Sequence, residues 1–261
     1  MGPKLDADIG ADLADLAERA ARLILPLWRT ELEVTAKADK SPVTEADRRA
    51  EALILEGLAA QFPNLPVISE EYASEFGTPD AIGPRFFLVD PLDGTKAFVR
   101  GDPHFTVNIA LIDAGEPVAG AVAAPASGEV WRTSKEGALK RHGEGTFEPV
   151  RARLWPKGAA IALVSHTMKT ETADALAAQY GFHLREPMDS SIKFCRIAEG
   201  AADIYPRHGT TMEWDTAAGH AVLAAAGGRV TTPEGEAFGY GAAKDGFKNG
   251  WFVARGRGGP S

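Results

Sequence analysis

The stretch Asp90-Pro91-Leu92-Asp93-Gly94-Thr95 follows directly on the apolar run Phe86–Val89. The apolar run predicts a buried strand, and the stretch after it places two carboxylates where that strand ends. Hard oxygen ligands on a short loop suit Mg²⁺, which usually binds a few carboxylates together with substrate phosphates. Gly94 lets the backbone approach an anion, and Thr95 adds a hydroxyl and an N–H. An acidic β-turn would also explain these residues, because turns favour Asp, Pro and Gly.

Acidic residues also stand at the ends of predicted elements elsewhere in the chain. Pro66-Val67-Ile68-Ser69-Glu70-Glu71 is typical of a short apolar strand that ends in two further acids. Thr44-Glu45-Ala46-Asp47 opens an apolar-periodic helix, and Glu213-Trp214-Asp215-Thr216 opens another. Because matching acidic pieces lie on both sides of the first stretch, the explanation as an isolated acidic turn is weakened.

These four segments, in this order, resemble the inositol monophosphatase family of Mg²⁺-dependent, lithium-sensitive phosphatases, and the resemblance extends over nearly the whole chain. The resemblance implies a layered α-β-α-β-α sandwich of the kind shared with fructose-1,6-bisphosphatase. It also implies an active site in the cleft between two halves and a cofactor of two or three Mg²⁺ ions.

The same resemblance implies roles for individual residues. Glu70, Asp90 and the carbonyl of Leu92 are expected to hold one Mg²⁺, and Asp90, Asp93 and Asp215 a second. Asp47 and Thr95 are expected to orient the nucleophilic water as a general-base relay. Glu71 is expected to lie behind the ligands or to face solvent, because side chains alternate along a strand and Glu70 takes the inward position.

Further segments resemble the 3'(2'),5'-bisphosphate nucleotidase branch of the family, namely Asp93–Phe98, Phe105–Leu111, Ser190–Cys195, Ala198–Gly200 and Tyr205–Arg207. That branch removes the 3'-phosphate of adenosine 3',5'-bisphosphate, a by-product of sulfate activation. One departure is Ala97, where many relatives carry Glu, and it puts one local contact in doubt.

Substrate contacts are expected on both sides of the predicted cleft. The N–H groups of Gly94 and Thr95 would cradle the phosphate. Lys193 and Arg207 match the branch's basic contacts to a second phosphate, with Ser190 as a hydroxyl partner and His166 at the edge.

Purely structural roles would also explain several of these residues. Thr44 and Asp47 fit a helix capping box, and Asp215 fits an N-cap. Lys and Arg side chains such as Lys193 and Arg207 usually lie on the solvated surface. Zinc is not indicated, since the spacing of the histidines at positions 104, 208 and 220 matches no zinc signature.

Composition narrows the class of partner. The formal charge of −8 argues against a nucleic-acid polymer, because no basic stripe is available to release counterions. A small phosphorylated molecule needs no such stripe. The single cysteine, Cys195, excludes an internal disulfide, fits a cytoplasmic location and is expected to be a packing residue. No apolar run is long enough to span a bilayer. The resemblance also suggests a homodimer.

The order of predicted elements divides the chain into two halves. Residues 1–140 combine two helices with a strand meander, which is typical of an α+β half that binds metal. Residues 141–261 alternate strands with helices, which indicates an α/β half that binds substrate. The expected fold class is therefore α/β overall.

The function that these observations favour is a Mg²⁺-dependent phosphomonoesterase acting on adenosine 3',5'-bisphosphate. Inositol-1-phosphatase, histidinol-phosphate phosphatase and a broad-specificity enzyme share the same chemistry and stay open. A catalytically silent phosphometabolite-binding regulatory protein is the alternative from another class, because fold does not fix function.

Overall fold

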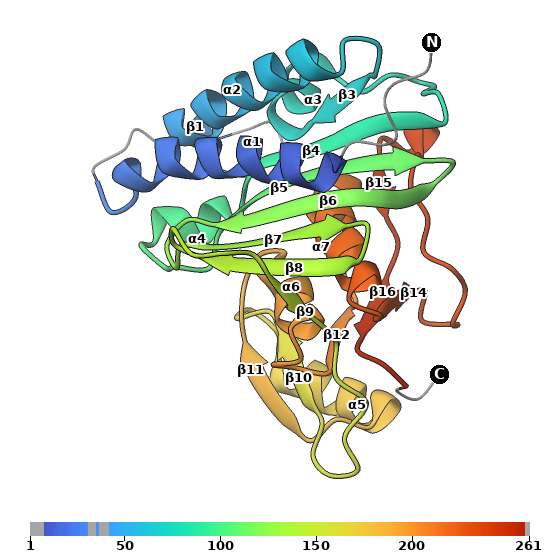
Figure 1. Ribbon diagram of the computed structural model, residues 1–261. Helices are drawn as coiled ribbons and strands as arrows, with labels where there is room; N and C mark the ends of the chain where they lie inside the picture. The colour runs from blue at the N-terminus through green and yellow to red at the C-terminus, as the bar shows by residue number, and fades with distance from the viewer. Residues whose placement is uncertain (1–7, 31–34, 37–41, 259–261) are drawn as a thin grey trace.

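Strand β4 (Arg85–Asp93) alternates its side chains between two hydrophobic cores, and this alternation organises the molecule. Phe87 and Val89 point to one core, whereas Phe86 and Leu88 point to the other. The protein is represented by a computed structural model, in which residues 8–30, 35–36 and 42–258 are described. Within these ranges the chain folds into α-helical and β-sheet layers, as Figure 1 shows.

The first sheet has seven strands in the order β3-β4-β5-β6-β7-β8-β9. β3 pairs parallel to β4, and every later neighbour pairs antiparallel. The bounds are β3 Val67–Ser69, β4 Arg85–Asp93, β5 Thr106–Asp113, β6 Glu116–Ala124, β7 Glu129–Ser134, β8 Gly137–His142 and β9 Glu148–Val150.

The second sheet has five strands in the order β11-β10-β12-β16-β14 and is partly parallel. Its bounds are β11 Leu184–Pro187, β10 Ile161–Val164, β12 Ile204–Arg207, β16 Phe252–Arg255 and β14 Arg229–Thr231. Two small antiparallel pairs complete the strands, β1 Thr35–Ala36 with β2 Pro42–Val43 and β13 Thr211–Met212 with β15 Lys248–Asn249.

The helices cover the sheets in three layers. Their bounds are α1 Ile9–Ile24, α2 Glu45–Gln61, α3 Glu70–Phe76, α4 Thr95–Val99, α5 Thr170–Tyr180, α6 Ile192–Ala198 and α7 Glu213–Ala225, with short 3₁₀ helices at Leu25–Leu27 and Ala243–Asp245. In Figure 1, α1 and α2 lie on the outer face of the seven-stranded sheet, α6 and α7 lie between the two sheets, and α5 lies beyond the five-stranded sheet. None of the helices in the described residues is long and apolar enough to cross a membrane.

Three hydrophobic clusters correspond to these layers. One contains the apolar face of α1 and α2 with Phe87, Val89 and Val107, and a second contains α6 and α7 with Phe86 and Leu88. The third packs α5 against the five-stranded sheet. The predicted α-β-α-β-α sandwich and the α/β class are confirmed.

Helix α7 is the element that joins the halves most closely. In the chain it lies between β12 and β14 of the second sheet, but it packs along β4, β5, β6, β7 and β8 of the first. Its close approach needs a residue without a side chain at Gly120 of β6, since a Cβ there would lie 2.9 Å from the Ala218 carbonyl. The predicted division at residues 140 and 141 stays a prediction, and the seven-stranded sheet extends as far as Val150.

Most predicted elements are present, with three kinds of difference. Strands β7, β8 and β9 were not predicted, because their side chains alternate only weakly between buried and exposed. β11 was not predicted either, since all four of its residues are exposed at the sheet edge. The acids Glu70 and Glu71 begin helix α3 and do not end a strand.

Candidate active site

Four carboxylates from three elements form one cluster. Glu70 begins α3, Asp90 and Asp93 lie in β4, and Asp215 lies in the first turn of α7. Single carboxylate oxygens of Glu70, Asp90 and Asp215 lie within 4.8 Å of one another. All four residues, called the acid cluster below, line a pocket of about 360 Å³. The structure therefore brings together the four acids that the sequence singled out.

A break in the β4–β5 ladder directs the β4 acids into this pocket. Pairing between the two strands shifts register between Asp90 and Asp93, at the position of Pro91, which has no N–H for the ladder. The chain then turns at Gly94, whose φ of 90° favours glycine. A Cβ at Gly94 would also lie 2.8 Å from the His104 carbonyl. The stretch is thus the irregular end of a strand leading into α4, and the β-turn interpretation is wrong.

Burial and mutual repulsion disfavour the charged forms of acids in the cluster. Burial, followed by repulsion from Glu70, raises the pKa of Asp90 well above its usual range. Burial and the charge of Asp93 raise the pKa of Asp215 in the same way. Carboxylates that lie this close together without enough positive charge favour either a proton or a metal ion between them.

Asp93 is the acid whose charge is best balanced. Burial raises its pKa to about 6, although the charge of Lys193 and the N–H of Ser191 act in the opposite direction. Its Oδ2 atom accepts hydrogen bonds from Ser191 N and, over 3.5 Å, from Asn108 Nδ2. Ser191 Oγ in turn donates to Asn108 Oδ1 over 2.6 Å.

Ser191 and Asn108 were not assigned roles from the sequence. Both are buried, and together they connect β5 to α6 directly beside Asp93. A polar Asn in the otherwise apolar run of β5 is the signal that could have identified this support.

Glu70 is oriented by the way α3 begins. Glu51 of α2 accepts hydrogen bonds from Ser69 Oγ and from the backbone N–H groups of Glu71 and Tyr72, so it caps the helix that Glu70 starts. Glu70 and Glu71 therefore lie in a helix, so the argument from side-chain alternation along a strand is wrong for both. Glu71 is buried, so its solvent-facing alternative is wrong as well.

Asp47 and Thr95 lie in hydrogen-bond contact, as a relay would require. Thr95 Oγ1 lies 3.2 Å from Asp47 Oδ1 and 3.1 Å from the Leu92 carbonyl oxygen. The other oxygen of Asp47 accepts from Thr44 N over 2.8 Å and from Thr44 Oγ1 over 2.6 Å. The capping box is therefore present, and it leaves one oxygen of Asp47 to face Thr95.

Asp215 has a capping contact of its own. It is the third residue of α7, and its Oδ2 accepts a hydrogen bond from Met212 N over 2.9 Å. The residue at the N-cap position is Met212, so the N-cap interpretation of Asp215 is wrong by three residues.

Lys193 is buried, which excludes its interpretation as a solvated surface charge. Its Nζ atom donates to the carbonyl oxygens of Ser190 over 2.6 Å and Met188 over 3.2 Å, and it lies over the Tyr205 ring. Burial lowers the pKa of Lys193 to about 8, although the charge of Asp93 opposes that shift. The pocket contains this ammonium group beside the acid cluster.

Arg207 lines the same pocket with much of its guanidinium unused. Its Nη2 makes a long contact of 3.5 Å with the Thr210 carbonyl oxygen, and its buried Nε has no partner among the described residues. A buried N–H without an acceptor is costly, so this group is suited to an anionic ligand.

The remaining predicted contacts are distributed around the pocket. Gly94, Thr95 and Ser190 line it, and so does Ala97. His166 is exposed beside Thr167, which lines the pocket, and its Nδ1 lies 3.3 Å from Asp189 Oδ2. His166 therefore lies beside the pocket, and its contact with substrate stays a prediction.

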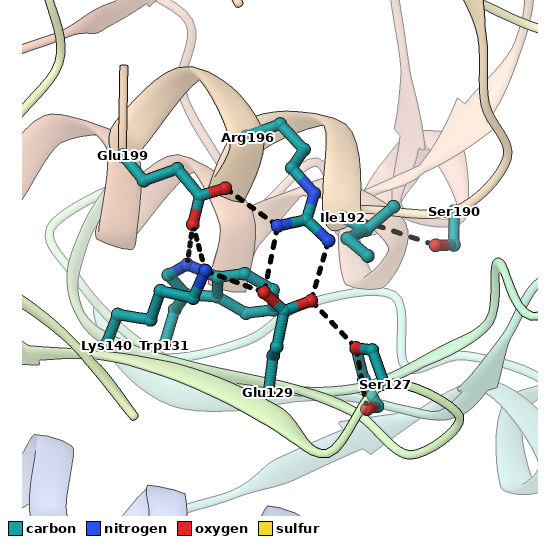
Figure 2. A network of polar contacts seen from close by, with 9 residues as sticks. Ser127, Glu129, Trp131, Lys140, Ser190, Ile192, Arg196 and Glu199 are labelled. Carbon is teal, nitrogen blue, oxygen red and sulfur yellow. Dashed lines mark hydrogen bonds and ion pairs between the residues drawn. The ribbon is translucent and has the colours of Figure 1, made fainter. Parts of the chain in front are cut away.

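A second charged cluster fixes α6, the helix that carries Lys193. Glu129 of β7 accepts hydrogen bonds from both terminal nitrogens of Arg196, at 3.0 and 2.6 Å, while Lys140 lies between Glu129 and Glu199 (Figure 2). Trp131 Nε1 donates to Glu199 over 3.0 Å. These five residues, called the clamp below, connect the seven-stranded sheet to α6.

Charge balance in the clamp has the opposite effect to that in the acid cluster. Burial alone would raise the pKa of Glu129, but hydrogen bonds from Arg196 and Lys140 lower it to about 2.

Cys195, next in the chain to Arg196, is buried, and its pKa is raised well above the usual range by burial. A thiol in that state is unreactive, which agrees with a packing role.

The acid cluster fits a Mg²⁺ site by the chemistry of its donors. All its ligand atoms are hard oxygens. The raised pKa values of Asp90 and Asp215 reflect burial first and then the negative charge of neighbouring carboxylates, which a dication would compensate. Leu92 lines the same pocket, and its carbonyl oxygen lies 3.1 Å from Thr95 Oγ1. Glu70, Asp90, Asp93 and Asp215 are thus the residues that would hold metal.

Comparison with known proteins identifies a related group. A model of the inositol monophosphatase family matches residues 9–255. The chain is 39% identical over 230 residues to the 3'(2'),5'-bisphosphate nucleotidase CysQ of Escherichia coli K12, covering 87% of this chain and 92% of that protein. It is 40% identical over 230 residues to the protein of the same name from Salmonella typhimurium, with the same coverage of both chains.

Solved structures agree with this similarity. CysQ from Bacteroides thetaiotaomicron superposes with a TM-score of 0.76 at 33% identity, covering 95% of this chain and 97% of that one. An inositol monophosphatase from Zymomonas mobilis superposes with a TM-score of 0.74 at 25% identity, covering 95% and 92%.

Proposed function

The chain belongs to the inositol monophosphatase family, and we propose on that basis that it is a Mg²⁺-dependent phosphomonoesterase that removes the 3'-phosphate of adenosine 3',5'-bisphosphate. The observation that carries the proposal is that one pocket contains both the acid cluster and the cations Lys193 and Arg207. The identity of 39–40% to the CysQ nucleotidases supports the same substrate.

A substrate with two phosphates suits such a pocket. One phosphate would lie against the acid cluster and its Mg²⁺, next to the N–H groups of Gly94 and Thr95. The other would accept charge-assisted hydrogen bonds from Arg207 and Lys193. Because an inositol monophosphate lacks that second group, the two cations favour the bisphosphate.

Two or three Mg²⁺ ions at the acid cluster would supply Lewis-acid activation of a water and would neutralise charge on the transferred phosphoryl group. The chain's own residues position that water. Thr95 Oγ1 donates to Asp47 Oδ1, and its lone pairs then accept a hydrogen bond from a water in the pocket. As the water attacks phosphorus, its proton passes to Thr95 Oγ1 while the Thr95 proton moves to Asp47.

A panel of phosphomonoesters tests the assignment. Purified protein with Mg²⁺ should hydrolyse adenosine 3',5'-bisphosphate with a higher kcat/KM than inositol-1-phosphate or histidinol phosphate. A preference for either of the other two would replace the nucleotidase assignment within the family. No turnover of any phosphomonoester would support the regulatory-protein alternative, which the four assembled acids argue against.

The metal dependence has its own test. We expect EDTA to abolish activity reversibly and Li⁺ to inhibit, and we expect Ca²⁺ to fail as a substitute because Mg²⁺ imposes stricter octahedral geometry. Full activity with Ca²⁺ alone would contradict the Mg²⁺ assignment.

The cellular setting is part of the same proposal. A cytoplasmic location in sulfur metabolism is proposed because the substrate is a by-product of sulfate activation and because a chain with one buried cysteine needs no oxidising compartment. A homodimer, which the family resemblance suggests, is open to direct measurement by sedimentation.

A further inference from the structure

Two histidines and an aspartate meet at the rim of the pocket, away from the acid cluster. Asp102 and His104 lie between α4 and β5, whereas His166 follows β10 in the other half of the chain. One potential ligand atom from each of the three residues lies within 4.8 Å of the other two. These residues are called the His–Asp cluster below.

The contact between His104 and Asp102 has the spacing of neighbouring metal ligands. His104 Nδ1 lies 3.1 Å from Asp102 Oδ1, but this buried nitrogen makes no hydrogen bond within the described residues. Asp102 Oδ1 already accepts the backbone N–H of His104 over 3.0 Å. Two ligands of a tetrahedral Zn²⁺ lie roughly 3.3 Å apart, given bond lengths of about 2.0–2.1 Å. A metal ion bound here would be coordinated by the lone pair of His104 Nδ1, which no hydrogen bond uses within the described residues.

His166 has the supporting contact that metal-binding histidines usually have. Its Nδ1 lies 3.3 Å from Asp189 Oδ2, and a carboxylate on one ring nitrogen of a histidine orients the other nitrogen toward a metal. The rings of His104 and His166 are 5.7 Å apart.

Charges around the cluster are balanced. Arg100 Nη2 lies 3.0 Å from Asp189 and 3.9 Å from Asp102, and the buried ammonium group of Lys193 also acts on Asp189 and His104, so two cations face two carboxylates. Burial lowers the pKa of His104, which keeps its lone pair available at neutral pH.

The donor set selects a different metal from the acid cluster. Two imidazoles and one carboxylate suit Zn²⁺ and related transition metals, whereas four carboxylates suit Mg²⁺. Three protein ligands leave a fourth position for water, as in sites that are not purely structural.

We propose that Asp102, His104 and His166 form a transition-metal site, and that Zn²⁺ bound there inhibits the enzyme by tying the two halves together at the mouth of the pocket. The position supports inhibition because Arg100, Thr167 and Asp189, neighbours of the cluster, all line the pocket. The backbone of His104 also packs directly against Gly94.

Direct binding to protein whose acid cluster is filled by excess Mg²⁺ tests the site without any need for turnover. Under these conditions wild type should bind one equivalent of Zn²⁺ by calorimetry, and Co²⁺ should give the visible absorption of nitrogen-containing, low-coordinate sites. His104→Gln and Asp102→Asn should weaken Zn²⁺ binding about a hundredfold or more, since loss of an outer-sphere partner alone typically costs about 10–100-fold. His183→Gln, which alters an exposed histidine outside the cluster, is the matched control and should bind as wild type does.

Asp90→Asn separates the two metal sites, because it alters the acid cluster and should leave Zn²⁺ binding at the His–Asp cluster unchanged. With Mg²⁺ in excess, Zn²⁺ should inhibit wild type and His183→Gln but should inhibit His104→Gln far less. Zn²⁺ binding that survives His104→Gln and Asp102→Asn, or that disappears in Asp90→Asn, would overturn the proposal.

Discussion

The acid cluster and the clamp are both groups of charged residues that join elements far apart in the chain, but their charges are balanced in opposite ways. The acid cluster combines four carboxylates, and burial with mutual repulsion raises the pKa of Asp90 and Asp215. The clamp pairs Glu129 and Glu199 with Arg196 and Lys140, and the pKa of Glu129 falls to about 2. A carboxylate that lies among other carboxylates is suited to binding a cationic ligand. A carboxylate that is paired with cations of the protein mainly stabilises the fold.

The largest difference between the two regions should appear in Asp90→Asn. Loss of a carboxylate that we assign to both metals should lower kcat/KM by about three orders of magnitude or more, while the metal-free variant should be as stable as wild type or more stable because repulsion is relieved. Steady-state kinetics and thermal unfolding in EDTA measure the two effects. Wild-type turnover at saturating Mg²⁺ would remove the metal assignment.

Arg196→Met should show the reverse behaviour. It leaves Glu129 and Glu199 with Lys140 as the only cation of the clamp. Because the Arg196 pairs are part-buried, their loss should cost more unfolding free energy than the about 1 kcal/mol of an exposed pair and less than the about 3–5 kcal/mol of a fully buried one. Arg185→Met is the matched control, because its pair with Asp174 is exposed and should be worth less than about 1 kcal/mol. Equal unfolding midpoints of the two variants in urea would contradict the structural role of the clamp.

Arg207→Ala tests the cation that the structure leaves unused. We expect kcat/KM for adenosine 3',5'-bisphosphate to fall about ten- to a hundredfold, which corresponds to the roughly 1.5–3 kcal/mol of a hydrogen bond to a charged group. Hydrolysis of inositol-1-phosphate should change far less. Lys193→Ala should act in the same direction, but it also releases the carbonyls of Met188 and Ser190, so Arg207 is the cleaner position. Equal losses on both substrates would assign the cations to the fold or the metal site.

The smallest expected effect concerns acid pH. Because the folded pKa of Glu129 is below its ordinary value of 4.5, its stabilisation is complete above that value and disappears as pH falls toward 2. Between pH 5 and pH 3 the clamp should lose up to about 2 kcal/mol, a loss that Glu129→Gln should not show. Urea unfolding of both proteins at the two pH values measures the difference.

The acid cluster should make the stability of the metal-free protein depend on pH with the opposite sign. The pKa of Asp93 is raised to about 6, so in metal-free protein its contribution is complete below its ordinary value of 3.8 and disappears as pH rises through 6. Metal-free protein should therefore gain stability from Asp93 as pH falls from 7 to 5. If wild type and Asp93→Asn both lose stability steadily as pH falls from 7 to 5, the acid cluster and the clamp do not differ as described.

The sequence was most informative where chemistry and local pattern coincide. The four acids could be found because each stands at the end of an apolar element, and the capping box at Thr44 and Asp47 is a local signal. The helix at Glu70 could not be distinguished from a strand end, since it begins directly after three strand residues and is capped by Glu51 from another helix.

The supports of the site were beyond local reasoning. Arg196 meets Glu129 across 67 positions of the chain, and Ser191 meets Asn108 across 83. No periodicity within a segment reports which distant segment will lie opposite to it. His104 and His166 belong to the same class, because the sequence places them in different halves and only the fold brings them to one rim.

The packing of α7 on the first sheet also determines when the inner face of that sheet can be buried during synthesis of the chain. The seven strands are complete once Val150 has been made, but the helix that covers their inner face ends at Ala225, about 75 residues later. At 5–20 residues per second, the nascent sheet waits about 4–15 s with Phe86, Leu88 and Val122 uncovered. The same helix carries Asp215, so the packing of α7 on the sheet completes the acid cluster. The same step buries the apolar surface through which the nascent chain could aggregate.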